Sequence, residues 1–148
     1  MSAAFRIPRS ILERTFEYFR ECGQGQRECQ MLWIGPWATP GTVTEAVHPK
    51  HDAHLGGFAL NDRWLNDFWI RLGHDNMGIR VQVHTHPGAA FHSKTDDEFP
   101  IIHKQGFLSL VIPNFGLGAV GFANAFLAEI QPDGAWREVA ISSRLVIE

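Results

Sequence analysis

Hydrophobic residues near the N-terminus recur at helical spacing. Between residues 10 and 22 the apolar side chains that would share one helix face are Leu12, Phe16 and Phe19. Ser10 and Glu13 have the spacing of a capping box, and Gly23 is placed to end the helix. The pattern predicts an amphipathic helix over residues 10–22.

A second helical pattern lies near the middle of the chain. Its apolar stripe consists of Trp64, Leu65, Phe68, Trp69 and Leu72. Asn61 or Asp62 is suited to cap the N-terminus of this helix, and Gly73 to stop it.

Strand patterns occupy much of the remaining sequence. The apolar run over residues 31–34 ends at Gly35-Pro36, which is typical of a strand buried on both faces. Residues 78–86 alternate and are rich in β-branched side chains. Further strands are predicted over 42–47, 58–60, 107–112, 119–130 and 137–147. Helices and strands mix without regular alternation, so we expect one α/β domain over residues 1–148, with a curved mixed sheet flanked by a few helices.

Composition and charge narrow the classes of partner. The chain has 148 residues and a net charge of −3, and no cluster of Lys and Arg interrupts the mixture. A basic footprint for nucleic acid or a membrane surface is therefore missing, and we expect neither partner. The first nine residues lack the apolar core of a signal peptide, and no run of about eighteen apolar residues follows, so a cytoplasmic location is expected.

The two cysteines, Cys22 and Cys29, flank a turn rich in Gly and Gln. They show neither zinc-ribbon spacing nor the pattern of a disulfide framework. The sequence therefore predicts two reduced, structural cysteines, Cys22 at a helix end and Cys29 in a strand.

The chain has eight histidines, and two of them lie two residues apart in a predicted strand. Strand residues at this spacing point to the same side, so His84 and His86 can present both imidazoles to one metal ion. Pro87 and Gly88 break the strand, so the chain can turn back and bring Asp96 or Asp97 to the same ion. Two imidazoles and one carboxylate, with a fourth position for water, form the ligand set of a catalytic zinc site.

These residues resemble the JAMM motif of the MPN (Mov34/JAB) metalloproteases, in which His-x-His-Pro is followed by Ser-x-x-Asp. The chain has His84-x-His86-Pro87 and then Ser93-x-x-Asp96. The family's upstream Glu-x-x-Gly-x-Leu-x-Gly strand corresponds to residues 28–35, with Met31 in place of the inner Gly. The interval from His86 to Ser93 is one residue shorter than in many members, so an ungapped count would select Asp97, whereas the intact Ser-x-x-Asp spacing favours Asp96.

The resemblance implies a role for each matching residue. His84, His86 and Asp96 would hold zinc, Glu28 would be the general base, and the Ser93 hydroxyl would stabilise the oxyanion.

The resemblance also implies an activity. Like the stand-alone bacterial JAB-domain proteins, the chain would be a zinc-dependent, deubiquitinase-like peptidase or isopeptidase. It would cleave after the C-terminal tail of a ubiquitin-like modifier. Its partners would be that modifier or its conjugates and conjugating-enzyme-like proteins, in a bacterial conjugation system of the kind used in antiphage defence. The alternatives are a zinc amidase acting on a small molecule or a sulfur-carrier protein conjugate, and a non-catalytic MPN scaffold.

Several other residues have simpler interpretations. Glu45, on the next predicted strand, is a rival base, but it lacks the following Gly pattern. Pro49 and the Gly56-Gly57 pair favour a loop for His48, His51 and His54. His92 and His103 are expected near the site or on the surface rather than as ligands. Core packing is expected for Trp33, Trp64, Trp69 and Trp136, whereas Trp37 fits a peptide groove and simple packing equally well.

Overall fold

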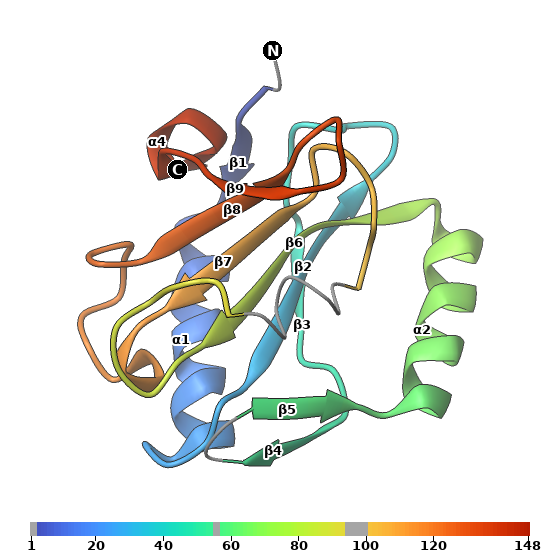
Figure 1. Ribbon diagram of the computed structural model, residues 1–148. Coiled ribbons are helices and arrows are strands. Elements are labelled where there is room, and N and C mark those ends of the chain that lie inside the picture. Colours follow the sequence, from blue (N-terminus) through green and yellow to red (C-terminus); the bar gives the residue numbers. More distant parts are fainter. Residues whose placement is uncertain (1–2, 55–56, 94–100) are drawn as a thin grey trace.

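The sheet of this protein is built around its longest strand, β6 (Met77–Thr85). The computed structural model describes residues 3–54, 57–93 and 101–148. In it, β6 pairs antiparallel with β2 (Gln30–Pro36) and parallel with β7 (Leu108–Ile112). The antiparallel outer strands are β3 (Glu45–Val47) beyond β2, and β8 (Phe126–Ile130) and β9 (Trp136–Glu138) beyond β7 (Figure 1). The order β3–β2–β6–β7–β8–β9 confirms the predicted α/β fold with a mixed sheet.

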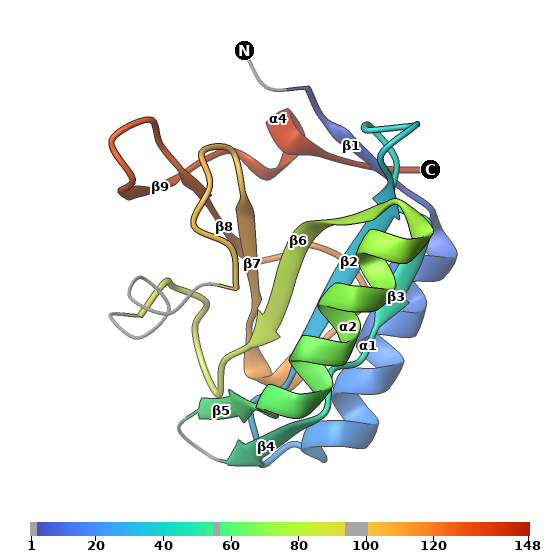
Figure 2. The same ribbon diagram turned by 90° about the vertical axis from the view of Figure 1, so that its right-hand side faces the viewer.

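Helix α1 (Arg9–Gly23) covers one face of this sheet. The buried side chains on that face include Met31, Trp33, Val81, Val83, Leu108 and Leu110, which pack with Phe16 and Phe19 of the helix. Because side chains alternate along a strand, the intervening residues of β2 and β6 point to the other face. Figure 2 shows α1 on one side of the sheet and the segment that follows β6 on the opposite side.

Helix α2 (Asp62–Asp75) packs on the face opposite α1. Phe68 and Leu72 of the helix belong to a buried cluster with Leu32, Ile34 and Ile79 of the sheet. Both faces of β2 are therefore buried, as the continuous apolar run in its sequence predicts.

The helix ends differ from the sequence predictions in physically clear ways. α1 begins at Arg9, after Pro8, and no side chain caps it. Ser10 therefore lies inside the first turn, and the predicted capping box is wrong. The helix ends when Gln24 adopts a left-handed conformation, with φ of 50°, and its N–H donates to the Arg20 carbonyl oxygen.

The second helix has the predicted N-cap but continues past the predicted stop. The Asn61 side chain accepts a hydrogen bond of 2.9 Å from the Trp64 N–H, which confirms one of the two candidate caps. Gly73 does not end the helix. The helix ends at Asn76, about two turns after the buried Phe68, where the backbone adopts a left-handed conformation with φ of 55°. Trp69 is 41% exposed and so lies outside the core, contrary to the prediction.

Two predicted strands near the C-terminus are shorter than expected. Positive φ angles at Gly121 and Asn124 interrupt residues 119–130, so only β8 remains as a strand. Residues 137–147 divide into β9, the short helix α4 (Ile141–Arg144) and β10 (Leu145–Ile147). The helical turn forms where the Ser143 hydroxyl and backbone N–H both donate to the Ala140 carbonyl oxygen.

Three further elements complete the described chain. β1 (Phe5–Ile7), which the sequence pattern does not reveal, pairs in parallel with β10. β4 (His51–His54) and β5 (Gly57–Leu60) form a hairpin, and a single 3-10 turn, η1 (Asn114–Gly116), follows β7. In both ribbon views the hairpin lies at the end of the sheet where β6 ends (Figures 1 and 2). No helix in the described ranges is long and apolar enough to span a membrane.

Gly35 marks a place where two backbone segments approach closely. A Cβ atom at this position would lie 2.1 Å from the Thr42 carbonyl oxygen, so a larger residue would force the segments apart. The final Gly of the upstream motif therefore has a packing role at the far end of β2. Met31, which replaces the inner Gly, is fully buried against the α1 side of the core.

A buried hydrogen bond joins α1 to the sheet. The indole N–H of Trp33 donates to the Thr15 hydroxyl oxygen at 2.8 Å, and the Thr15 hydroxyl donates to the Ile11 carbonyl oxygen at 2.7 Å. Trp33 and Thr15 are both fully buried. An unpaired indole N–H at this position would have no access to water.

We therefore expect Thr15→Val to destabilise the fold by about 1–3 kcal/mol, because it removes the hydroxyl that accepts from a buried donor while keeping the shape of the side chain. Urea unfolding would measure the change. Thr15→Ser, which keeps the hydroxyl, is the matched control and should cost less. Equal stability of the valine variant and the wild type would contradict this account of the contact.

Candidate metal centre

The C-terminal end of β6 places two histidines side by side. His84 lies between Gln30 of β2 and Val111 of β7 in the sheet register and is 1% exposed. His86 follows the last residue of the strand and is 4% exposed. Its N–H donates to the Ile112 carbonyl oxygen at 3.0 Å, and its own carbonyl oxygen accepts from the Phe115 N–H at 2.8 Å. The backbone of His86 is therefore held as firmly as that of a strand residue.

The spacing of the two imidazole rings fits a shared metal ion. Their centroids lie 5.2 Å apart, with the ring planes inclined by 49°. Two imidazoles bound to one tetrahedral zinc at about 2.0–2.1 Å per nitrogen place their ring centroids roughly 5 Å apart. His84 and His86 therefore meet the distance requirement of a two-histidine zinc site.

Glu28 precedes a residue that is hydrogen-bonded to the strand position between the two histidines. The Cys29 N–H donates to the Thr85 hydroxyl oxygen at 3.0 Å, and the Thr85 N–H donates to the Cys29 carbonyl oxygen at 3.1 Å. These bonds extend the antiparallel register of Gln30 and His84 by one residue beyond β2. Continuing the same register by one more residue would put Glu28 opposite His86. Glu28 is 9% exposed.

Residues 91–93 run over the His84 side of the sheet. The imidazole of His92 packs against the indole of Trp136, with centroids 4.5 Å apart, and lies 6.4 Å from both the Phe126 and the His84 ring centroids. Ser93, the next residue, is half-buried. The aromatic contacts of His92 therefore hold the residue before Ser93 near His84. His92 was expected near the site, and Trp136 joins it there as a contact that sequence patterning did not reveal.

The carboxylate of the predicted ligand set lies outside the described residues. Asp96 and Asp97 both fall in the interval 94–100, so the choice between them stays a prediction. In the part of the chain that the structure describes, no three His, Cys, Asp or Glu side chains gather closely enough to hold a metal ion. His84 and His86 thus have a geometry that fits a metal site, while the site itself and its third ligand stay predictions from the sequence.

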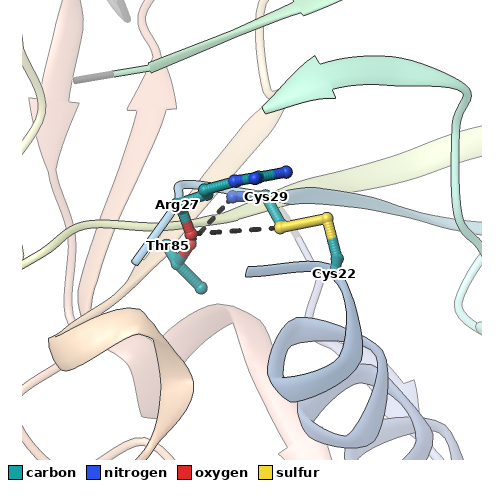
Figure 3. Close-up of a disulfide and its surroundings, with 4 residues drawn as sticks. All are labelled: Cys22, Arg27, Cys29 and Thr85. Carbon is teal, nitrogen blue, oxygen red and sulfur yellow. Dashed lines mark hydrogen bonds between the residues drawn. A yellow bond between two sulfur atoms is a disulfide. The ribbon is translucent and has the colours of Figure 1, made fainter. Parts of the chain in front are cut away.

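The cysteine prediction is wrong. Cys22 and Cys29 are joined by a disulfide, with Cα atoms 6.3 Å apart (Figure 3). Cys22 is in the last turn of α1, and Cys29 lies one residue before β2 rather than in the strand. A spacing of seven residues could not reveal the bond, because the turn after α1 and the register of β2 together bring the two side chains face to face.

Glu45 is poorly placed as a rival base. It lies opposite Ile34, four residues along β2 from Gln30, which corresponds to roughly 13 Å of strand. Both carboxylate oxygens of Glu45 accept hydrogen bonds from the Arg71 guanidinium of α2, at 3.1 and 3.0 Å. The hydrogen bond to Glu45 raises the pKa of the Arg71 guanidinium. Glu45 is thus engaged at the other end of the sheet.

The other histidines are placed as follows. His51 and His54 are the end residues of β4, so the loop predicted for them is wrong, since this segment pairs with β5. The imidazole of His48 stacks on Tyr18 of α1, with centroids 5.2 Å apart. His103 is exposed. Among the tryptophans, Trp33 lies in the core as predicted, and Trp37 is 58% exposed.

Similarity to known proteins agrees with this geometry. No family model matches the chain. A probable metalloprotease, y4jG of Sinorhizobium fredii, is 29% identical over 147 residues, covering 95% of this chain and 91% of the relative. Among solved structures, protein DSY2949 of Desulfitobacterium hafniense has a TM-score of 0.70 at 14% identity, covering 97% of this chain and 92% of the other.

The solved structure of AF2198, a JAB1/MPN domain protein from Archaeoglobus fulgidus, has a TM-score of 0.53 at 13% identity, covering 98% of this chain and 100% of that one. The chain thus has the fold of a JAB1/MPN domain. This fold and the similarity to a probable metalloprotease agree with the resemblance to the JAMM/MPN family that the sequence motifs carry.

We expect the purified chain to bind about one zinc ion, and His84→Ala to lose most of it, because two buried imidazoles are needed to hold the ion. Metal analysis after dialysis would measure the content. The exposed His103→Ala variant is the matched control and should keep its zinc. If His84→Ala is folded, as judged by circular dichroism, and still retains the ion, the pair does not form the site.

Proposed function

We propose that this chain is a zinc-dependent peptidase or isopeptidase that cleaves after the C-terminal tail of a ubiquitin-like modifier. The observation that carries the proposal is the buried pair His84 and His86, at 5.2 Å, with the Glu28 segment hydrogen-bonded to the residue between them. The partners proposed with it are the modifier or its conjugates and conjugating-enzyme-like proteins, in a conjugation system of the antiphage type.

His84 and His86 would hold the ion, and Asp96 would complete the protein ligands. When bound, zinc lowers the pKa of a coordinated water and polarises the carbonyl of the substrate. The two imidazoles are oriented before any ion arrives, because β6 and its neighbours fix the backbone on both sides. The backbone of the two histidines therefore requires little rearrangement to bind the metal.

Glu28 would carry the proton through the reaction. Its carboxylate takes a proton from the attacking water, whose oxygen forms the new bond to the carbonyl carbon. It then gives that proton to the leaving nitrogen as the carbon–nitrogen bond breaks. Both transfers need the carboxylate near the two histidines, and the hydrogen bonds between the next residue, Cys29, and Thr85 favour that position.

Ser93 would stabilise the negative charge that develops on the carbonyl oxygen. Its hydroxyl is a hydrogen-bond donor, and a donor fixed before the reaction contributes more than one that must reorient. The packing of His92 against Trp136 supports this role, because it restrains the residue immediately before Ser93.

An extended peptide tail suits the surroundings of the histidines. The β4–β5 hairpin lies at the same end of the sheet as the end of β6 (Figure 1), and a tail could add to strands there by backbone hydrogen bonds. Phe91 packs its ring against His86, with centroids 4.6 Å apart, while remaining 54% exposed. An exposed aromatic side chain next to the pair is suited to contact an apolar residue of the tail.

Glu28→Gln is expected to reduce kcat/KM by about 100- to 10,000-fold while leaving zinc content unchanged, because the amide cannot accept the proton. The substrate would be a ubiquitin-like protein whose C-terminus continues through an amide bond into a reporter, with a short amide reporter assayed in parallel. Glu45→Gln is the matched control and should retain activity.

The outcomes separate the candidate functions. Cleavage of the fusion far above the short amide supports the proposal, whereas the reverse preference indicates a small-molecule amidase. A zinc-loaded chain that cleaves neither substrate would point to a scaffold. An active Glu28→Gln variant would show that another residue is the base.

The third ligand can be tested separately by comparing Asp96→Asn with Asp97→Asn. We expect zinc to be lost from the Asp96 variant and retained by the Asp97 variant, since the Ser93-x-x-Asp96 spacing selects Asp96. Metal content measured at one zinc concentration gives the answer. Loss confined to the Asp97 variant would show that the shorter interval after His86 shifts the ligand by one residue.

A further inference from the structure

The Cys22–Cys29 disulfide lies directly beside the segment that the proposed reaction depends on. It joins the last turn of α1 to the residue after Glu28 (Figure 3). Cys29 is fully buried, whereas Cys22 is partly exposed. A Cβ atom on Gly23 would lie 3.4 Å from the Cys29 sulfur, so the helix end itself packs closely on the bond.

Cys29 is held from two directions. Its N–H donates to the Thr85 hydroxyl oxygen at 3.0 Å, and the disulfide joins its side chain to α1 (Figure 3). The Thr85 N–H also donates to the Cys29 carbonyl oxygen, at 3.1 Å. Thr85 is the residue between His84 and His86. The position of Glu28 relative to the histidines therefore depends on a residue that both the disulfide and the sheet restrain.

The segment on the other side of Glu28 has weaker support. Residues 24–27 form a turn with exposed side chains at Gln24, Gln26 and Arg27. Gln24 and Gly25 both have positive φ angles, and the N–H groups of Gln26 and Arg27 donate to the same Gly23 carbonyl oxygen. Glu28 itself precedes the β2 ladder, which begins at Gln30. Without the disulfide, the Thr85 bonds would have to hold the end of the connection from the helix, residues 24–29.

We propose that the Cys22–Cys29 disulfide is a redox-sensitive positioning element for Glu28. When it is intact, Cys29 is fixed against Thr85 and Glu28 faces the histidine pair. When it is reduced, Cys29 and Glu28 move more freely and hydrolysis slows, while the metal ligands on β6 stay in place. This inference rests on the proposed function, in which Glu28 is the general base.

The chemistry requires a dithiol reductant. A thiolate of the reductant attacks the partly exposed Cys22 sulfur, the sulfur–sulfur bond breaks, and the Cys29 thiolate leaves and takes up a proton. The second thiol of the reductant then attacks the mixed disulfide, releasing Cys22 as a thiol and the reductant as its own disulfide. In the cytoplasm, where the sequence predicts that the chain works, disulfides of this kind are rare and commonly redox-sensing.

Amide hydrogen exchange on the metal-free protein tests the structural part of the proposal without using activity. After reduction by dithiothreitol and its removal under inert gas, we expect the Cys29 amide to exchange at least about tenfold faster, because local opening becomes easier. The Leu110 amide, in the centre of the sheet, is the internal control and should not change. An unchanged exchange rate at Cys29 would overturn the proposal, whatever the activity of the protein.

Kinetics on the zinc-loaded enzyme tests the consequence. Reduction should lower kcat by about tenfold with KM and zinc content unchanged, and reoxidation should restore it. The Cys22→Ala/Cys29→Ala variant should have the lower kcat before any treatment and should not respond to dithiothreitol. The same variant is the control for chelation of zinc by dithiothreitol. A purely structural disulfide would instead lower the unfolding temperature and leave kcat at 25 °C unchanged, which would contradict the proposal.

Thr85 provides an independent check on the same element. Thr85→Val removes the hydroxyl that accepts from Cys29, so it should make kcat more sensitive to reduction, and Thr85→Ser should restore the wild-type response. Equal responses of kcat to reduction in the wild type, Thr85→Val and Thr85→Ser would also overturn the proposal. If the oxidised wild type cleaves no amide at all, the proposed function fails, while the exchange result still reports on the positioning of Cys29.

Discussion

The antiparallel pairing of β2 with β6 determines where the chemical groups of this protein can meet. This register puts Gln30 opposite His84, and the Cys29–Thr85 hydrogen bonds continue it past the end of β2. A slip of one residue would turn His84 into the α1 core and Val83 onto the metal side. Burial of alternate residues on both faces prevents such a slip, because Val81 and Val83 fit only the apolar α1 side. The core that stabilises the sheet thus also fixes the site.

Much of the fold could be predicted from the sequence because burial leaves a clear pattern in it. The apolar run of β2, the alternation of β6 and the stripe of α2 each reflect contacts that the structure contains. Element ends were less predictable, since backbone conformation at single residues decides them. Gln24 and Asn76 end the helices in left-handed conformations that their neighbours Gly23 and Gly73 would have adopted more readily. The short β1 strand depends on a partner 140 residues away, which no local pattern can indicate.

The residues of the candidate site also differ in how far they could be predicted from the sequence. Residues that lie close in sequence, such as His84 and His86, could be assigned from strand geometry alone. Glu28 could be assigned only from its resemblance to a family motif, because its place beside the histidines results from sheet pairing. The roles of Thr85 and Trp136 could not be predicted, since each acts by contacting a residue distant in sequence. The disulfide was missed for a related reason: its two cysteines meet only once α1 has docked against β2.

The central proposal is a metal ion held at the end of β6 by His84 and His86, whose ring centroids lie 5.2 Å apart. The most direct test is a crystal structure of the zinc-loaded chain with anomalous diffraction measured at the zinc edge. The account predicts one strong peak about 2.0–2.1 Å from a ring nitrogen of both His84 and His86, on the Glu28 side of the sheet. A peak at His48 or His103, with none at the β6 pair, would contradict it.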